Sequence, residues 1–435
     1  MNKLLAKSKK LAEKLPGYDR AVLPWHRYQA FRAATKNDYP ASGMKVIGVT
    51  GTNGKTTTSF MIHRMLVEAG KKTGILTTIG YGSGKNIKPQ IEHMTTVDPM
   101  KLNKRIAKMA EDGVEYLVLE LTSHALVQYR AFGIPIDVAV ETNVTHEHLD
   151  YHKTFKKYRD AKIKLFKQAN ATRGGKKVGI INADDPSAGR FRKVIDRPIT
   201  YGIDKGDVQA RQVRLNGGAD YFVKYDGRKL HIKTQIPGVF NIYNSLAAVI
   251  VGIVYGLTND EIEQGIAALD FVEGRMNRID EGQKFEVVMD YAHTPDSFEK
   301  LLPDMKKSSK GRLIVVFGSA GGRRDPSKRR PMGEIAGRYA DVVILTEEDD
   351  RDTPGEQILK TIASGAEKSG KKEGKNLFKI LDRTTAIDFA LKSAKPGDTV
   401  LLLGKGNEKT IERSDGEHPW DEAATARRLL KQLKK

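Results

Sequence analysis

The chain has 435 residues, with 74 lysines and arginines against 54 aspartates and glutamates, and no cysteine. Disulfides, thiolate metal sites and cysteine nucleophiles are therefore excluded, and a metal ion would have to bind through oxygen or imidazole. No run approaches the roughly 20 apolar residues that a membrane span needs, and the N-terminal stretch lacks the apolar core of a signal peptide. We expect a cytoplasmic protein without a membrane span.

The first predicted elements are one or two short basic helices in residues 1–43, which end in a turn at residues 40–43. This segment has too few residues to form a domain. From residue 45, apolar strands alternate with helical patterns, and this alternation predicts a doubly wound parallel sheet. The strands are expected at 46–50, near Thr73, at 116–121 and at 136–143, and the helices at 56–70 and 100–113.

Two further blocks follow along the chain. Residues 202–236 contain short alternating runs that predict a small antiparallel insertion. After Arg275 a second alternating series begins, with continuous apolar strands that suit a sheet covered by helices on both faces. We therefore predict an α/β protein with a basic helical extension at 1–43, a central P-loop ATPase domain at 44–275 and a second, Rossmann-like α/β domain at 276–435.

The net charge of +20 is compatible with nucleic acid, an anionic membrane surface or acidic substrates. Basic residues are spread along the chain, and the densest cluster, residues 323–330, lies between a predicted strand and a predicted helix. Because charge runs are usually solvated faces, we interpret the charge as a generally basic surface. We expect no nucleic-acid partner.

The stretch GVTGTNGKTTTSF at residues 48–60 follows a strand and opens a helix, which is the context that a phosphate-binding loop requires. The usual spacing places a glycine at the position of Val49. Lys55 would neutralise the β and γ oxygens of ATP, and the Thr56 hydroxyl would bind Mg²⁺. The backbone that would hold the phosphates belongs to Gly51, Thr52, Asn53, Gly54 and Thr57.

Two polar stretches stand at predicted strand ends, ELTSHALVQYR at 120–130 and TNVTHEHLDYH at 142–152. In a parallel sheet, ligands gather at the carboxyl ends of the strands, so both stretches would face the phosphate-binding loop. A carboxylate and an imidazole there would suit Mg²⁺. Spacing alone also allows Glu120 to be a helix cap and the histidines to be surface residues.

These motifs together resemble the Mur ligase superfamily of ATP-dependent peptide-bond formers, whose phosphate-binding loop has the same glycine offset. The two strand-end stretches look like the muramyl-tripeptide synthetase branch. That resemblance implies Mg²⁺ binding by Glu120 and His148. The segment YRDAKIKLF at 158–166 is similar to the family segment with a carbamylated lysine, which maps to Lys162 and would bridge to a second Mg²⁺.

The resemblance continues through residues 44–435. GVFNIYNSLAA resembles the segment that borders the adenine, with Asn241 and Asn244. VEGR resembles the hinge, where Arg275 would reach ATP, and MDYAHTP resembles the segment in which Asp290 would contact the ribose when the domains close. Residues 1–43 cannot replace the family's N-terminal domain, which grips the uridine nucleotide, so the resemblance leaves open whether the acceptor carries UDP.

The resemblance implies a reaction in which ATP converts a carboxylate to an acyl phosphate that an amine then attacks. A muramyl-dipeptide-like acceptor, rather than a folate, would be held by a set of polar residues in the TTVD segment and the first strand-end stretch. These are Thr95, Thr96, Thr122, Gln128 and Arg130.

The donor segments resemble those of the diaminopimelate-adding members. These members have an arginine before proline, a D-N-P-R motif and a G-K-G-H-E motif. Matching positions here are Arg330, Arg351, Gly404 and Glu408, while Asp349 and Asp350 replace Asn and Pro, and Asn407 replaces His. The retained arginine and glutamate suit an amino acid with a distal carboxylate and an ammonium group. The two extra acids leave room for lysine.

Two other classes of function are compatible with parts of the sequence. A folylpolyglutamate- or cyanophycin-type ligase would share the ATP motifs but would not need the TSHALVQYR and DYAHTP segments. A basic P-loop protein that binds polyanions would account only for the charge. We expect a monomeric ligase that uses ATP, two Mg²⁺ ions, a muramyl-peptide precursor and an amino acid.

Overall fold

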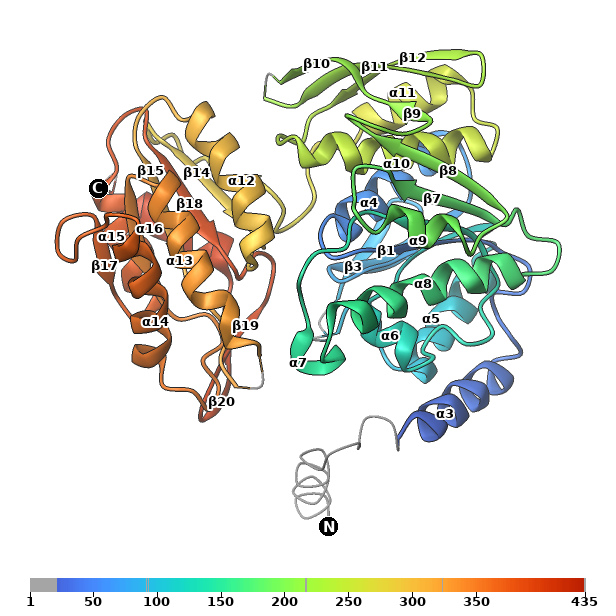
Figure 1. Cartoon of the computed structure of the whole chain (residues 1–435), viewed down its shortest axis with the longest axis horizontal. Coiled ribbons are helices and arrows are strands. Elements are labelled where there is room, and N and C mark those ends of the chain that lie inside the picture. The colour runs from blue at the N-terminus through green and yellow to red at the C-terminus, as the bar shows by residue number, and fades with distance from the viewer. Residues whose placement is uncertain (1–21, 91, 93, 216, 323, 434–435) are drawn as a thin grey trace.

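The protein is described by a computed structural model that covers residues 22–433, apart from residues 91, 93, 216 and 323. The first 21 residues of the predicted basic extension lie outside the described residues, as do His93 of the acceptor segment and Arg323 of the basic cluster. Figure 1 shows two lobes side by side, a central lobe in blue to yellow and a C-terminal lobe in orange to red. The linker between them follows α11 (Asn259–Ala267).

The central lobe is built on a nine-stranded sheet within the described residues, in the order β4-β3-β2-β5-β1-β6-β7-β8-β9. All strands from β2 to β9 in this order are parallel, while β3 and β4 form an antiparallel hairpin at one edge. The strands are β1 (Lys45–Thr50), β2 (Thr73–Leu76), β3 (Gly80–Ser83), β4 (Asn86–Pro89), β5 (Tyr116–Glu120), β6 (Ile136–Glu141), β7 (Val178–Asn182), β8 (Arg197–Gly202) and β9 (Val208–Gln209).

Helices cover both faces of this sheet, which explains why β5 and β6 are buried at every position. One hydrophobic core joins the sheet to α4, α10 and α11, and a second core joins it to α5, α6, α8 and α9. The helices of this lobe are α3 (Leu23–Lys36), α4 (Lys55–Glu68), α5 (Pro99–Glu111), α6 (Ser123–Val127), α7 (Leu149–His152), α8 (Phe155–Ala171), α9 (Ala188–Arg192), α10 (Phe240–Val254) and α11.

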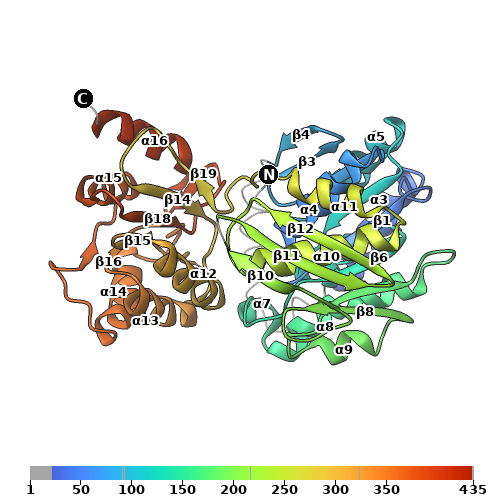
Figure 2. The same cartoon turned by 90° about the horizontal axis from the view of Figure 1, so that it is seen from above.

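A small antiparallel sheet lies at the outer side of α10, as the alternating runs of residues 202–236 predict. Its strands are β10 (Arg211–Leu215), β11 (Ala219–Tyr225) and β12 (Arg228–Thr234). Figure 2 shows these strands crossing over α10. Because α10 is covered by sheets on both sides, its sequence, FNIYNSLAAVIVGIV, is apolar around most of its circumference.

The C-terminal lobe has a second α/β sheet in the order β13-β14-β18-β15-β16-β17, parallel except for β13. A hairpin of β19 and β20 extends from it. The elements are β13 (Asn277–Arg278), β14 (Glu286–Asp290), α12 (Pro295–Ser308), β15 (Leu313–Phe317), η1 (Pro326–Lys328), α13 (Arg329–Tyr339), β16 (Val342–Leu345), α14 (Gly355–Lys368), β17 (Leu377–Lys379), α15 (Arg383–Ser393), β18 (Thr399–Leu403), β19 (Thr410–Arg413), β20 (Gly416–Pro419) and α16 (Glu422–Leu433).

This arrangement confirms the predicted fold class of two α/β units in series. The strand ends of β1, β5 and β6 lie at one edge of the central sheet, because Val49 pairs with both Glu120 and Val140. Polar residues that follow these strands are thereby brought together. Among residues 22–433, no described helix is long and apolar enough to cross a membrane.

Candidate active site

A cavity of about 1180 Å³ is lined by residues of both lobes. The central lobe contributes the loop after β1, the ends of β5 and β6 and the start of α10. The C-terminal lobe contributes the loop after β14 and two loops near the ends of β16 and β18. The cavity therefore meets the carboxyl ends of the parallel strands in both sheets, where α/β proteins bind ligands.

The loop between β1 and α4 has the backbone of a phosphate cradle. Gly51 and Gly54 have φ angles of 153° and 83°, and a Cβ atom would lie 1.8 Å from the Thr142 hydroxyl and 2.3 Å from the Asn244 amide oxygen, respectively. Glycine is thus required at both positions. No side chain caps the N-terminus of α4, so its backbone N–H groups are available to an anion.

Lys55 and two residues after β6 hold this loop in place. The Lys55 ammonium group donates to the backbone oxygens of Gly51 and Thr52, at 3.0 and 2.7 Å. The Thr142 hydroxyl and the Asn143 amide both donate to the Asn53 backbone oxygen, at 2.6 and 2.9 Å. Thr142 and Asn143 stand in the quoted TNVTHEHLDYH stretch, but sequence reasoning did not assign them this bracing role.

A carboxylate and two hydroxyl groups meet beside the loop. Glu120, which is 1% exposed, accepts from the Thr56 hydroxyl at 3.0 and 3.2 Å and from the Thr78 hydroxyl and backbone N–H at 3.0 Å each. Oxygen groups of this kind are the ligands that Mg²⁺ prefers. Thr56 and Glu120 therefore fit a magnesium site. Thr78, which accompanies them, was not predicted from the sequence.

His148 reaches the same cavity from the segment after β6. It has a left-handed backbone, with φ 55°, and its Nε2 atom lies 3.6 Å from Glu147. Burial lowers the pKa of His148, although Glu147 opposes this shift, so the imidazole favours its neutral form. Among the described residues, no group of three or more histidines, aspartates or glutamates forms a ready-made metal cluster.

Glu147 also links the two lobes. Its carboxylate lies 3.3 Å from His293 Nε2, in the loop after β14, and a second link is a 2.7 Å hydrogen bond from the Asn53 amide to Asp296. Burial alone would raise the pKa of Glu147, but His148 and His293 together hold it well below its usual value. These contacts place the C-terminal lobe directly against the phosphate-binding loop.

Lys162 lies behind the loop rather than in the cavity. Its ammonium nitrogen is buried, donates to the Gly51 backbone oxygen at 2.6 Å and lies 4.4 Å from the centre of the Tyr158 ring. Burial, followed by the charge of Lys55, lowers the pKa of Lys162 well below its usual value. The side chain is therefore an amine that readily loses its proton.

The predicted adenine and ribose residues also line the cavity, and Asn244 lies beside Gly54 of the loop. Asn244 donates to Asn241 at 2.8 Å, which fixes both amides at the start of α10. Arg275 lies over the Tyr291 ring, 4.4 Å from its centre. Asp290 accepts from the backbone N–H groups of Met276 and Ala292, at 2.9 and 2.8 Å. The hinge and the loop after β14 are thereby joined.

The predicted acceptor residues form one connected group. Arg130 donates to Gln128 at 2.6 and 3.1 Å and to the backbone oxygen of Thr96. The Thr96 hydroxyl donates to the Glu120 backbone oxygen at 3.0 Å. Thr95, Thr122 and Arg130 line the cavity, whereas Thr96 is buried behind it. The group begins beside Glu120 and so lies next to the phosphate-binding loop.

The residues predicted to hold the donor belong to a network of alternating charges in the C-terminal lobe. Arg351 donates to Glu412 at 2.7 Å and lies 3.6 Å from Asp349. Lys405, which is fully buried, donates to Asp349 at 2.9 Å and to Glu408 at 2.5 Å. Of these residues, Asp349, Arg351, Glu408 and Glu412 line the cavity. Glu412, on β19, was not predicted.

Two predicted donor residues are not part of the cavity lining. Arg330 is exposed at the start of α13, and its backbone packs against Gly365 of α14. Gly404 is buried, with a φ of 103° and its Cα next to the Glu348 carboxylate. The structure therefore brings Arg351 and Glu408, but not Arg330 or Gly404, to the cavity surface.

Comparison with known proteins gives matches along most of the chain. The sequence profile of the Mur ligase middle domain matches residues 49–252, and that of the Mur ligase glutamate ligase domain matches residues 274–406. The chain is 40% identical over 414 residues to the UDP-N-acetylmuramyl-tripeptide synthetase of Roseiflexus sp. (strain RS-1), which covers 92% of this chain and 81% of the relative.

Other similarities extend this result. The chain is 38% identical to the UDP-N-acetylmuramoyl-L-alanyl-D-glutamate--2,6-diaminopimelate ligase of Geobacillus kaustophilus, over 90% of this chain and 80% of the relative. A solved ligase structure of the same name superposes with a TM-score of 0.63 at 30% identity, over 94% and 82% of the two chains. A Mycobacterium tuberculosis folylpolyglutamate synthase gives a TM-score of 0.70 at 16% identity, over 93% and 94%, and shows the shared fold.

Proposed function

The chain belongs to the Mur ligase family of ATP-dependent amide-forming ligases, and from this premise we propose that it adds an amino acid to a muramyl-peptide precursor in peptidoglycan synthesis. The observation that carries the proposal is that one cavity joins the phosphate-binding loop, the Arg130 group and the charged network around Arg351. A nucleotide, an acceptor and a donor would each have a separate wall of this cavity.

The first step is phosphoryl transfer from ATP to the acceptor carboxylate, which gives ADP and an acyl phosphate. The phosphates would bind at the loop and at the N-terminus of α4, where Lys55 neutralises their charge. Arg130, held by Gln128 and Thr96, would fix the acceptor so that its carboxylate lies beside the loop. Mg²⁺, bound by Thr56 and Glu120, would supply charge neutralisation at the phosphate oxygens, and a second ion would use His148.

The second step is attack of the donor's amine on the acyl phosphate, which forms a tetrahedral intermediate and releases inorganic phosphate. The donor would lie between Arg351 and Glu408, so that its amine points toward the acceptor. The contacts between Glu147 and His293 and between Asn53 and Asp296 keep the lobes together and exclude water, which would otherwise hydrolyse the acyl phosphate.

We further propose that Lys162 is carbamylated. Its lowered pKa favours loss of the proton, which addition of the amine to carbon dioxide requires, and its neighbour Lys55 would attract the resulting anion. A carbamate at Lys162 would place a negative charge next to the positive charge of Lys55. The modified side chain would then also be suited to a metal ion near the loop.

The retained Arg351 favours a donor with a distal carboxylate, which supports diaminopimelate over lysine. We propose that the enzyme acts as a monomer, and the use of ATP supports a cytoplasmic reaction. The small-molecule partners would be ATP, the muramyl-peptide precursor and the amino acid.

A phosphate-release assay tests the function. UDP-muramyl dipeptide plus diaminopimelate or lysine should give ATP-dependent phosphate release and a tripeptide product, and the same assay with a folate and glutamate should give neither. A Lys55→Ala variant should be inactive but folded, because the lysine's contacts are with loop oxygens and not with the core. Ligation of folate, or near-normal turnover by Lys55→Ala, would contradict the proposal.

A further inference from the structure

An aromatic face on α3 stands apart from the active site. Trp25, Tyr28 and Phe31 are 56%, 52% and 48% exposed, and Tyr39, just after the helix, is 37% exposed. Trp25 and Tyr28 contact each other, with ring centres 5.7 Å apart. We call these four residues the aromatic face. Soluble proteins scatter exposed apolar residues singly, so four aromatic side chains on one short segment indicate a binding surface.

The opposite side of α3 explains why the aromatic residues point outward. Ala30, Ala33 and Ala34 are at most 1% exposed, and the helix packs against α5. Asn37 ends the helix and donates to the sulfur of Met100 on α5, at 3.6 Å. The small alanines thus fix α3 on the central lobe and leave Trp25 and Tyr28 toward solvent, while the half-exposed Phe31 ring also meets the Phe132 ring edge-on, with ring centres 6.1 Å apart.

The charged side chains of α3 itself are all basic, and one exposed acid, Asp38, lies between the helix end and Tyr39. The sequence of α3, LPWHRYQAFRAATK, contains no acid, and Arg27, Arg32 and Lys36 are exposed. The sequence before it, residues 1–21, adds five lysines and one arginine against one glutamate and one aspartate. Exposed aromatic rings flanked by lysine and arginine are the combination that binds the interface of an anionic lipid bilayer.

We propose that α3 docks the protein on an anionic phospholipid surface, with the aromatic face in the interface and Arg27, Arg32 and Lys36 against the lipid phosphates. A second copy of this chain is a poorer occupant, because two identical basic helices repel each other. Single-stranded nucleic acid is also poorer, because it is held in grooves, and α3 lines neither of the two cavities described for residues 22–433.

The position of α3 agrees with such docking. Figure 1 shows it at the lower edge of the central lobe, away from the C-terminal lobe, and the three-stranded sheet lies at the opposite edge. Docking through α3 would leave the movement of the lobes free. The surface is therefore independent of the ligase reaction, and ligase activity reports separately on folding.

Vesicle binding by the full chain tests the proposal. The protein should sediment with vesicles of phosphatidylcholine and phosphatidylglycerol but not with phosphatidylcholine alone, and added salt should release it. Trp25 is one of two tryptophans, so its emission should shift to shorter wavelength on binding. The Trp25→Phe variant should keep the binding and lose this shift.

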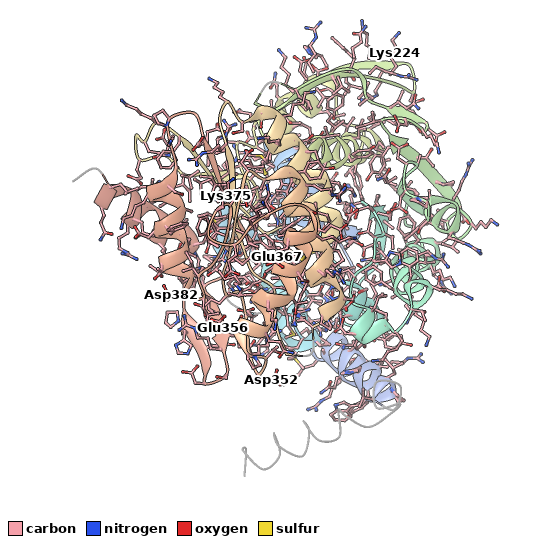
Figure 3. All side chains as sticks on the ribbon, turned by 60° about the vertical axis from the view of Figure 1, so that its left-hand side comes forward. Lys224, Asp352, Glu356, Glu367, Lys375 and Asp382 are labelled. Atoms are coloured by element: carbon pink, nitrogen blue, oxygen red, sulfur yellow. The ribbon has the colours of Figure 1, made fainter. Side chains whose placement is uncertain are left out.

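Two variants and a matched control locate the surface. A variant with Arg27→Gln, Arg32→Gln and Lys36→Gln should bind anionic vesicles roughly a hundredfold more weakly, because each basic residue near the surface contributes about fivefold. A variant with Trp25→Ser, Tyr28→Ser and Phe31→Ser should also lose binding. Removal of three charges from the opposite edge, by Arg211→Gln, Arg214→Gln and Lys224→Gln, should have little effect; Figure 3 shows Lys224 on the outer side of its sheet.

Each alternative gives a distinct result. Equal loss in the α3 charge variant and the matched control would overturn the proposal, as would binding to neutral vesicles as strong as to anionic ones. A dimer in light scattering that becomes monomeric in the aromatic variant would assign the face to a second copy. Equally tight binding of a single-stranded oligonucleotide through α3 would also contradict a lipid surface. Unchanged ligase activity in all variants shows that they are folded.

Discussion

The side-chain nitrogen of Lys162 lies 2.6 Å from the backbone oxygen of Gly51, so a buried lysine on α8 directly supports the phosphate-binding loop. A lysine on an amphipathic helix ordinarily extends into solvent. Burial here lowers its pKa well below the usual value, and the nearby charge of Lys55 adds to this effect. The contact thus joins the geometry of the loop to a lysine whose proton is held weakly.

We expect Lys162→Ala to lower ligase turnover by roughly a hundredfold or more, the size of effect seen when one charge-stabilising group is removed from an active site. If the native side chain is a carbamate, added formate or acetate should restore part of the activity. Lys167→Ala, at an exposed position on the same helix, is the matched control and should remain near wild type. Loss of activity without any rescue would leave Lys162 only a role in supporting the loop.

A buried ion pair should dominate the stability of the C-terminal lobe. Arg383 donates two hydrogen bonds to Glu422, at 2.6 and 2.8 Å, and both side chains are 0% exposed. Glu422→Gln leaves the buried guanidinium without its counter-charge and should lower the free energy of unfolding by about 3–5 kcal/mol. Urea denaturation measures this change.

The exposed pair Arg338–Glu299 is the control for that experiment. Glu299→Gln should change the free energy of unfolding by less than about 1 kcal/mol, because both partners remain hydrated. Similar losses in the two variants would show that burial does not determine the contribution of the Arg383–Glu422 pair.

The stability of the protein should depend on pH through Asp350. Burial, followed by the charge of Glu347, raises its pKa from 3.8 to about 6. The folded carboxyl therefore binds a proton more tightly than the unfolded one, and its contribution to stability falls as pH rises from about 4 to 6. Asp350→Asn should be more stable than wild type above pH 6, and the difference should shrink toward pH 4. A difference that does not vary with pH would contradict the raised pKa.

The sheets could be predicted from the sequence because their strands are continuous apolar runs between helical patterns. The glycine-rich loop between β1 and α4 was also predictable, since Gly51, Gly54 and Lys55 stand between such a strand and a helix. The backbone geometry of these three residues is set by residues close to them in the chain, so the sequence predicts it. The grouping of Arg130 with Gln128 and Thr96 was indicated only by the family resemblance, which implies that these residues hold the acceptor.

Contacts between distant charged residues could not be predicted in the same way. Arg383 and Glu422 look like exposed residues in the sequence, because charged side chains are rarely buried unless they are paired. The ion pair between Arg351 and Glu412 could not be predicted from the sequence either, since Glu412 belongs to a hairpin whose position depends on the whole lobe. Sequence spacing carries no information on such tertiary pairing.

Donor choice is the prediction that most depends on this tertiary pairing. Arg351 lines the cavity, and its guanidinium contacts Glu412 and lies near Asp349. If it binds a distal carboxylate, diaminopimelate should be preferred over lysine. A charge-assisted contact contributes about 1.5–3 kcal/mol, so Arg351→Ala should weaken diaminopimelate use by roughly tenfold to a hundredfold.

The weaker use of diaminopimelate should appear as a rise in KM for diaminopimelate, with little change in KM for ATP, because Arg351 is not among the residues that are predicted to bind ATP. Glu412→Gln is the matched variant: it keeps Arg351 but removes a competing carboxylate, so it should maintain or strengthen the preference for diaminopimelate.

Asp349 and Asp350 oppose a preference for diaminopimelate, because their negative charges favour the ammonium group of lysine. Asp349 already forms an ion pair with Lys405, at 2.9 Å, which weakens its attraction for the ammonium group of a donor. Steady-state kinetics with diaminopimelate and with lysine measure the donor preference of the wild type and of both variants. A wild-type preference for lysine that neither substitution alters would refute the role of Arg351. The ligase assignment would still stand.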